Sequence, residues 1–209
     1  MPWHLKMKTS EIYGVILAAG ESSRLGFPKQ LLPFRNQTIL GTVVGNVLKS
    51  KLKKIVLVLG FKAQEIKKSL NRQIRNKKIK ILINRNFKKG KATSVQLALK
   101  KIPFNCEAVM FILGDKPRVD GKLINQLLKT FHRKKGLLAF PIYQTQRGNP
   151  VIFHRKFFPE LLKLKGDYGG QKLIQKYWSS AAKLKLKSRD SQFEVNSWED
   201  YFKLLCQEK

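Results

Sequence analysis

Three observations predict that this chain has an α/β fold, with a mostly parallel central sheet flanked by helices on both faces. Short apolar runs rich in β-branched residues alternate with segments that carry apolar residues at three- and four-residue intervals. The 209 residues fall within the range of one domain that encloses a sizeable core. A loop with two glycines follows the first apolar run, and ligands of such folds lie at the carboxyl ends of the strands.

The first expected strand lies in the apolar run from Ile12 to Ala19, which is too short for a membrane-spanning helix. The expected strands are Tyr13–Ala18, Lys54–Leu59, Ile79–Ile83, Ala108–Leu113, Leu137–Pro141 and Val151–Phe153. Apolar spacing and capping residues predict helices at Thr38–Lys49, Lys62–Ile74, Thr93–Lys101, Asp120–Arg133, Gly170–Ser179 and Ser197–Cys206.

The chain shows no linker, low-complexity tract or internal repeat. The first ten residues lack the apolar core of a signal peptide, and Cys106 and Cys206 lie far apart without metal-ligand spacing. We therefore expect residues 1–11 to be an N-terminal tail and residues 12–209 to be one domain. The expected location is cytoplasmic, without membrane association.

The loop after the first strand, residues 18–29, has the residue types that bind a polyphosphate. Gly20 and Gly26 permit close backbone approach and leave N–H groups free to face an anion. Arg24 can bind phosphate oxygens as a fork, and Pro28 stiffens the segment from which Lys29 projects as a point charge. An ordinary strand-to-helix turn with two solvated cations fits the same spacing, and neither common phosphate-binding motif is present.

Asp115 ends another strand that should be buried, since it follows the apolar residues 110–113 and Gly114. It can cap the next helix or form a turn with Pro117, or it can bind Mg²⁺, a hard cation that prefers carboxylate and phosphate oxygens. Because Asp115 and the first loop fall at the same edge of the expected sheet, we favour the Mg²⁺ ligand.

The first loop resembles Leu-Ala-Ala-Gly-x-x-x-Arg-x-Gly-x-x-Lys, the signature of nucleotidyltransferases with a Rossmann-like, glycosyltransferase-A-like domain. Further matches follow in the family's order over about residues 12–205, which is nearly the whole chain. They are Asn84–Gly90 with Ser94–Leu99, Gly114–Pro117, Gly148–Pro150, Gly166–Gly170 and Glu194–Asp200. Within this family the chain is most similar to the molybdenum cofactor cytidylyltransferases.

The resemblance implies a Mg²⁺-dependent nucleotidyltransferase that moves CMP from CTP to the phosphate of molybdopterin and releases pyrophosphate. The implied nucleotide-binding residues are Leu17, Ala18, Ala19, Gly20, Arg24, Lys29, Ser94 and Gly114. The implied catalytic residues are Arg24, Lys29 and Asp115, the metal ligands Asp115 and Asn196, and the acceptor-binding residues Gly148, Asn149 and Asp167. CTP rather than GTP is implied because Ala19 stands where the guanylyl branch has glycine.

Three positions depart from the family's pattern. Asn196 stands where related enzymes have Asp, with Glu194 two residues before it; Asn149 replaces a usual His; Lys116 replaces a frequent Gln. The residues 148–150 also fit a plain turn, and Asp167 also fits a helix cap.

The implied reaction needs no general base from the protein. A phosphomonoester has a second pKa of about 6, so the attacking acceptor is mostly dianionic at neutral pH. The chain has three histidines, His4, His132 and His154, and none is an obvious catalytic residue. This absence therefore does not count against nucleotidyl transfer. The protein must supply alignment and neutralisation of phosphate charge.

The charge of the chain is strongly positive, because 43 Lys and Arg face 13 Asp and Glu, a net charge of +30. Such a field attracts CTP and a phosphorylated acceptor, and predicts non-specific polyanion binding at low salt. Lysine clusters such as residues 49–54, 77–80, 88–91 and 183–187 are expected on helix ends and loops as a solvated surface. Aromatic residues do not interleave with them as a nucleic-acid stacking platform requires.

Two alternatives remain at this stage. One is a nucleotidyltransferase that uses GTP or another phosphorylated acceptor, such as a sugar, an alcohol or an isoprenoid precursor. The other is a non-catalytic, basic nucleic-acid-binding relative that kept the fold. If the resemblance holds, the expected partners also include a molybdoenzyme or its chaperone, to which the finished cofactor is delivered.

Overall fold

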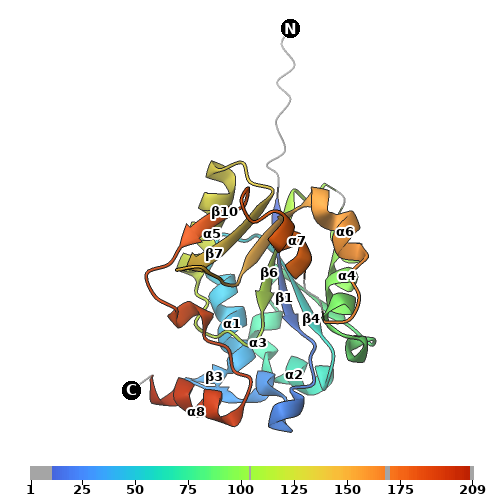
Figure 1. The fold of residues 1–209 in the computed structure, drawn as a ribbon. Helices are drawn as coiled ribbons and strands as arrows, with labels where there is room; N and C mark the ends of the chain where they lie inside the picture. Colours follow the sequence, from blue (N-terminus) through green and yellow to red (C-terminus); the bar gives the residue numbers. More distant parts are fainter. Residues whose placement is uncertain (1–10, 104, 168–169, 208–209) are drawn as a thin grey trace.

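The computed structural model describes residues 11–103, 105–167 and 170–207, so residues 1–10 of the expected tail lie outside the described residues. The main sheet has the strand order β10-β7-β9-β6-β1-β4-β5, with β8 paired to β7. Its strands β10, β7, β6, β1 and β4 are labelled in Figure 1. The strands are β1 (Ile12–Ala18), β4 (Lys54–Leu59), β5 (Ile79–Ile83), β6 (Ala108–Leu113), β7 (Leu138–Tyr143), β8 (Gln146–Arg147), β9 (Val151–His154) and β10 (Ala182–Lys185).

Pairing in this sheet is mostly parallel, as predicted. β1 pairs in parallel with β4 on one side and β6 on the other, β5 continues the order beyond β4, and β10 is parallel to β7. β9 is antiparallel to both β6 and β7, and β8 is antiparallel to β7. In β4 every residue after Lys54 is buried, as expected for a parallel strand covered on both faces.

Helices cover both faces of the sheet. One core cluster joins it to α1 (Ile39–Leu48), α2 (Ala63–Ser69) and α5 (Gly121–Arg133), and a second joins it to α4 (Lys91–Lys101), α6 (Phe158–Leu162) and α7 (Gln171–Lys176). The C-terminal helix α8 (Trp198–Cys206) packs on a third cluster with the segment after the first loop, which includes β2 (Pro33–Phe34) and β3 (Gln37–Thr38) (Figure 1).

Three predicted helices begin at side-chain caps. Thr38 Oγ1 accepts from the Gly41 N–H at 3.0 Å, and Asp120 Oδ1 accepts from the Leu123 N–H at 2.8 Å. Ser197 and Asp200 form a reciprocal capping box that starts α8. These local polar contacts explain why the boundaries of these helices agree with the sequence pattern.

The expected helix over residues 62–74 is not continuous, and this is a correction. It consists of α2, ending at Ser69, and a separate short α3 (Asn71–Ile74). Ser69 Oγ donates to the Ile66 carbonyl at 2.8 Å, and the Leu70 N–H donates to the same carbonyl at 3.2 Å, so the last turn of α2 shares its acceptor with a side chain.

The lysine cluster at residues 183–187 lies partly in a strand, which is a second correction. Lys183 and Lys185 belong to β10, at the edge of the sheet. Charged side chains on an edge strand oppose pairing with another chain, so lysine there is compatible with a strand.

None of the helices in the described residues is long and apolar enough to cross a bilayer.

The two cysteines are expected to differ in reactivity. Cys106 is buried, and burial raises the pKa of its thiol to about 11, whereas Cys206 is exposed. The thiolate is the reactive form, so a thiol reagent at pH 8 should modify Cys206 alone in the folded protein and both cysteines in urea. Intact mass after labelling measures this, and two labels on the folded protein would contradict the burial of Cys106.

Candidate active site

A cleft of about 380 Å³ opens at the carboxyl ends of β1 and β6. The chain leaves β1 for β4 on one side and reaches β6 on the other, so the cleft lies at the topological switch point where α/β sheets bind ligands. All eight implied nucleotide-binding residues line it, together with Asp115, Asp167, Glu194 and Asn196. The fold thus brings these residues from distant parts of the sequence to one cavity.

The first loop presents a run of free backbone amides. Within the described part of the chain, the N–H groups of residues 20–24 donate to no protein acceptor. Ser22 has φ 58° and ψ 41°, a left-handed conformation that turns the chain before a short 3-10 helix (Ser23–Leu25). Successive free amides around such a turn form a concave site for an anion.

Gln30 holds this loop in place, and sequence reasoning missed its role. The residue is 3% exposed, and Nε2 donates to the carbonyls of Ala18 at 3.2 Å and Gly20 at 3.1 Å. Ser22 Oγ accepts from the Lys29 N–H at 3.2 Å. These bonds occupy carbonyls of the loop and leave its amides available, an arrangement that sequence spacing alone does not show.

Gly20 is expected to serve the ligand rather than the fold. A Cβ built on Gly20 meets nothing within 4 Å, and its φ is not in the left-handed range. We expect Gly20→Ala to change the free energy of unfolding by less than about 1 kcal/mol, the helix-interior cost of glycine relative to alanine. Since glycine allows close approach of a ligand to the backbone, the variant should weaken nucleotide binding; unchanged affinity in calorimetry would contradict this role.

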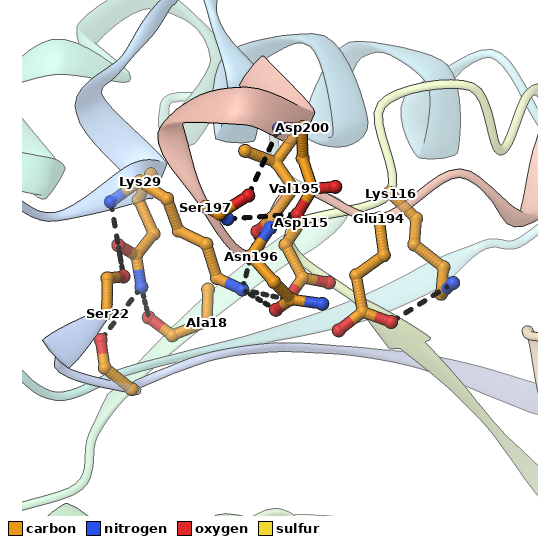
Figure 2. Close-up of polar contacts among 12 residues, drawn as sticks. Ala18, Ser22, Lys29, Asp115, Lys116, Glu194, Val195, Asn196, Ser197 and Asp200 are labelled. Atoms are coloured by element: carbon orange, nitrogen blue, oxygen red, sulfur yellow. Dashed lines mark hydrogen bonds and ion pairs between the residues drawn. The ribbon is translucent and has the colours of Figure 1, made fainter. Parts of the chain in front are cut away.

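The two cations of the first loop differ in their contacts. Arg24 is exposed at the cleft and forms no hydrogen bond or ion pair with the described residues. Lys29 Nζ instead pairs with Asp115 Oδ2, and donates to the Val195 carbonyl at 2.9 Å and to Asn196 Oδ1 at 3.0 Å (Figure 2). The guanidinium of Arg24 is therefore available to bind an anion, whereas the ammonium of Lys29 already contacts three protein oxygens.

The oxygens around Lys29 fit a magnesium ion. Asp115 Oδ1 is buried and has no hydrogen-bond partner among the described residues. The other carboxylate oxygen, Asp115 Oδ2, and Asn196 Oδ1 both contact Lys29 Nζ. Asp115 does not cap the next helix, since Asp120 does. In residues 11–103, 105–167 and 170–207, no group of three His, Cys, Asp or Glu could hold a metal, so phosphate oxygens must complete any such site.

Lys116, one of the three departures from the family's pattern, forms an ion pair beside the cleft. Lys116 is buried, and its Nζ donates to the Gln192 carbonyl at 2.6 Å. The same Nζ pairs with Glu194 Oε2 at 3.2 Å (Figure 2). Burial alone would raise the pKa of Glu194, but the Lys116 ammonium and hydrogen bonds from Asn196 and Lys116 outweigh it and lower that pKa. The carboxylate of Glu194 thus stays charged beside the cleft.

The side chain of Asn149 forms hydrogen bonds with the backbone of β6. Its Oδ1 accepts from the Leu113 N–H at 3.1 Å, so its side chain caps the end of β6. Its own N–H and carbonyl bond the side chain of Gln192 at 2.6 Å and 2.9 Å, and its peptide bond to Pro150 is cis. Gly148 lies against Gln192 as well, since a Cβ there would lie 2.5 Å from that side chain. Sequence reasoning gave Gln192 no role.

Asp167 and Ser94 are fixed by contacts around the start of α4. Asp167 Oδ1 accepts from the Lys91 N–H, the first of α4, at 3.0 Å. It is not the N-cap of α7, which is Gly170. Ser94 is buried, and its Oγ accepts from Asn84 Nδ2 at 2.9 Å. Both side chains line the cleft.

A family model described as a MobA-like NTP transferase domain matches residues 14–182, a span that includes the first loop and Asp115. The chain belongs to this family. It is accordingly a nucleotidyltransferase, a conclusion that the fold supports.

The relatives to which this chain is similar carry different functional names. The molybdenum cofactor cytidylyltransferase of Escherichia coli is 29% identical over 143 residues, 68% of this chain and 70% of the relative. A probable molybdenum cofactor guanylyltransferase of Thermococcus sibiricus is 25% identical over 91% of this chain and 96% of the relative. Nicotine blue oxidoreductase of Paenarthrobacter nicotinovorans is 28% identical over 80% of this chain and 83% of the relative.

Among solved structures, this MobA-like chain is similar to Rv0371c from Mycobacterium tuberculosis H37Rv in complex with manganese. The two have a TM-score of 0.79 and 26% sequence identity, over 94% of this chain and 98% of that one.

Proposed function

We propose that this nucleotidyltransferase transfers CMP from CTP to the phosphate of molybdopterin, with Mg²⁺ as its cofactor and pyrophosphate as the second product. The observation that carries the proposal is the meeting of the amide loop, Arg24, Lys29 and Asp115 in one cleft at the switch point. Ala19 in the cleft wall and the similarity to the cytidylyltransferase of Escherichia coli support CTP and molybdopterin.

The residues of the first loop would bind the triphosphate. The free amides of residues 20–24 and the unpaired guanidinium of Arg24 are donors for phosphate oxygens, and Lys29 is within the same cleft. These groups neutralise charge that shifts toward the leaving pyrophosphate, which is the main electrostatic task in nucleotidyl transfer. Ser94 and the backbone at Ala18 and Ala19 would contact the nucleoside.

Asp115, with Asn196 beside it, would hold Mg²⁺ against the phosphates. Mg²⁺ commonly binds through one or two carboxylates plus substrate phosphates, which matches this donor set. When bound, the ion supplies Lewis-acid stabilisation of phosphate charge. The acceptor phosphate attacks the α-phosphorus as a dianion, and the protein's part is to align it.

The acceptor would enter from the side of β7, β8 and β9. A smaller groove of about 80 Å³ there shares Leu17, Lys91, Leu113 and Asp167 with the main cleft. Arg147 lines this groove, and its guanidinium forms no hydrogen bond or ion pair with the described residues. A free guanidinium next to the nucleotide cleft is suited to an anionic acceptor.

Removal of the Arg147 guanidinium should weaken binding of the acceptor and leave binding of CTP unchanged. We expect Arg147→Ala to raise the KM for the acceptor about tenfold, the equivalent of about 1.4 kcal/mol, with CTP affinity unchanged. Arg133→Ala, which removes an exposed arginine of α5, is the matched control. Equal acceptor KM values in the two variants would remove Arg147 from the acceptor site.

Thermal unfolding with CTP, GTP, ATP and UTP, each with and without Mg²⁺, tests the nucleotide. A ligand at 100 times its dissociation constant stabilises the folded state by about 2.7 kcal/mol, which shifts the melting temperature by a few degrees. The proposal expects the largest rise with CTP and Mg²⁺. A larger rise with GTP would assign the chain to guanylyl transfer, and no rise with any nucleotide would oppose the proposal.

The proposal includes a cytoplasmic location and delivery of the product to a molybdoenzyme or its chaperone. The net charge of +30 would steer both anionic substrates to the protein and would add non-specific polyanion binding at low salt.

A further inference from the structure

The ammonium of Lys29 is fully occupied by protein oxygens. An ammonium has three N–H donors, and those of Lys29 face Asp115 Oδ2, the Val195 carbonyl and Asn196 Oδ1 (Figure 2). The side chains of Lys29 and Asp115 are only 15% and 17% exposed. A positive charge therefore already lies at the point where the candidate metal-binding oxygens converge.

The charges around this point also balance. Lys29 neutralises Asp115, and the neighbouring Lys116 neutralises Glu194. Asn196 contributes an oxygen but no charge. A divalent ion that displaced Lys29 in the absence of nucleotide would meet two carboxylates, Asp115 and Glu194, and two ammonium groups, Lys29 and Lys116. These four charges sum to zero, which makes a weak site because affinity rises with the negative charge of the ligands.

We propose that Lys29 closes the metal site of the nucleotide-free enzyme, so that a divalent ion binds only together with a triphosphate. The inference rests on the proposed function, since the triphosphate supplies the negative charge that draws Lys29 away from Asp115 and compensates the ion. The released carboxylate oxygens, including the unpartnered Oδ1, are then free for the metal.

The orientation of Asn196 makes this residue the sharpest place to test the inference. Its backbone N–H bonds Asp200 Oδ2 at 2.9 Å as part of the cap of α8, which holds residue 196 beside Lys29. Asn196→Asp keeps the shape of the side chain and adds one negative charge. The added charge should open a site for a divalent ion in the absence of nucleotide.

The experiment is a titration of the nucleotide-free protein with Mn²⁺, followed by the electron paramagnetic resonance signal of the free ion. We expect no binding by the unmodified protein up to millimolar Mn²⁺. Asn196→Asp and Lys29→Met should each bind at least tenfold more tightly, the first by adding a carboxylate and the second by removing the competing ammonium. Asn71→Asp, the same change at an exposed position of α3, should bind no more tightly than the unmodified protein.

Binding of Mn²⁺ to the unmodified, nucleotide-free protein as tight as binding to Asn196→Asp would overturn the inference. Melting curves establish that each variant is folded, and if Lys29→Met is not, Asn196→Asp decides the question. Calorimetry of CTP with and without Mn²⁺ separates this inference from the proposed function. If CTP does not bind at all, the proposed function fails, and closure by Lys29 fails with it because no triphosphate is then available to release the lysine.

Discussion

Asp115→Asn is expected to lower kcat/KM for nucleotidyl transfer by about 10²–10³-fold, the usual cost of removing one electrostatic group from a transition state. The change keeps the shape of the side chain but removes the charge that pairs with Lys29 and the carboxylate that would hold Mg²⁺. Steady-state rates of pyrophosphate release at several Mg²⁺ concentrations measure the loss, and higher Mg²⁺ should restore part of the activity.

Asp190→Asn provides the control for this comparison. It makes the same chemical change at an exposed residue outside the cleft. Activity of Asp115→Asn within a factor of three of this control would exclude a catalytic role for the Asp115 carboxylate.

Gly90→Ala is expected to have the largest effect on stability, a loss of about 2–5 kcal/mol in the free energy of unfolding. Gly90 has φ +98°, and a Cβ there would lie 2.4 Å from the carbonyl carbon of Gly166, a backbone atom that cannot rotate away. The two segments are joined by a bond from the Ala92 N–H to the Gly166 carbonyl at 2.9 Å. Urea denaturation of the purified variant measures the change.

Gly20→Ala is the internal comparison, because it adds the same methyl group to the same cleft without a steric conflict. The two variants should separate fold from binding, with Gly90→Ala losing stability and Gly20→Ala losing nucleotide affinity. Equal stability of the two variants would mean that residues 90 and 166 do not pack as described.

The parts of the site that could be predicted from sequence are contiguous. Gly20, Arg24 and Lys29 fall within one short loop after an apolar strand, and Asp115 directly follows another, so local pattern and strand polarity together predict that they meet. The sheet was predictable for the same reason, since its central strands are buried apolar runs.

The remaining parts depend on contacts between distant segments. Gln192 meets Asn149 across 43 positions, and Lys29 meets Asn196 across 167, so no local pattern shows either contact. The helix α6 has five residues, and β10 has four with two lysines, so both are too short for a periodic signal. Gln30 holds the first loop only because it is buried against the carbonyls of Ala18 and Gly20, and the sequence does not show that burial.

Incubation of the protein with molybdopterin, Mg²⁺ and CTP labelled at the α-phosphate tests the central claim most directly. The account predicts that label passes to molybdopterin in step with pyrophosphate release, and that Asp115→Asn abolishes most of the transfer. No transfer of label from CTP, under conditions in which another labelled triphosphate or another phosphorylated acceptor reacts, would contradict it.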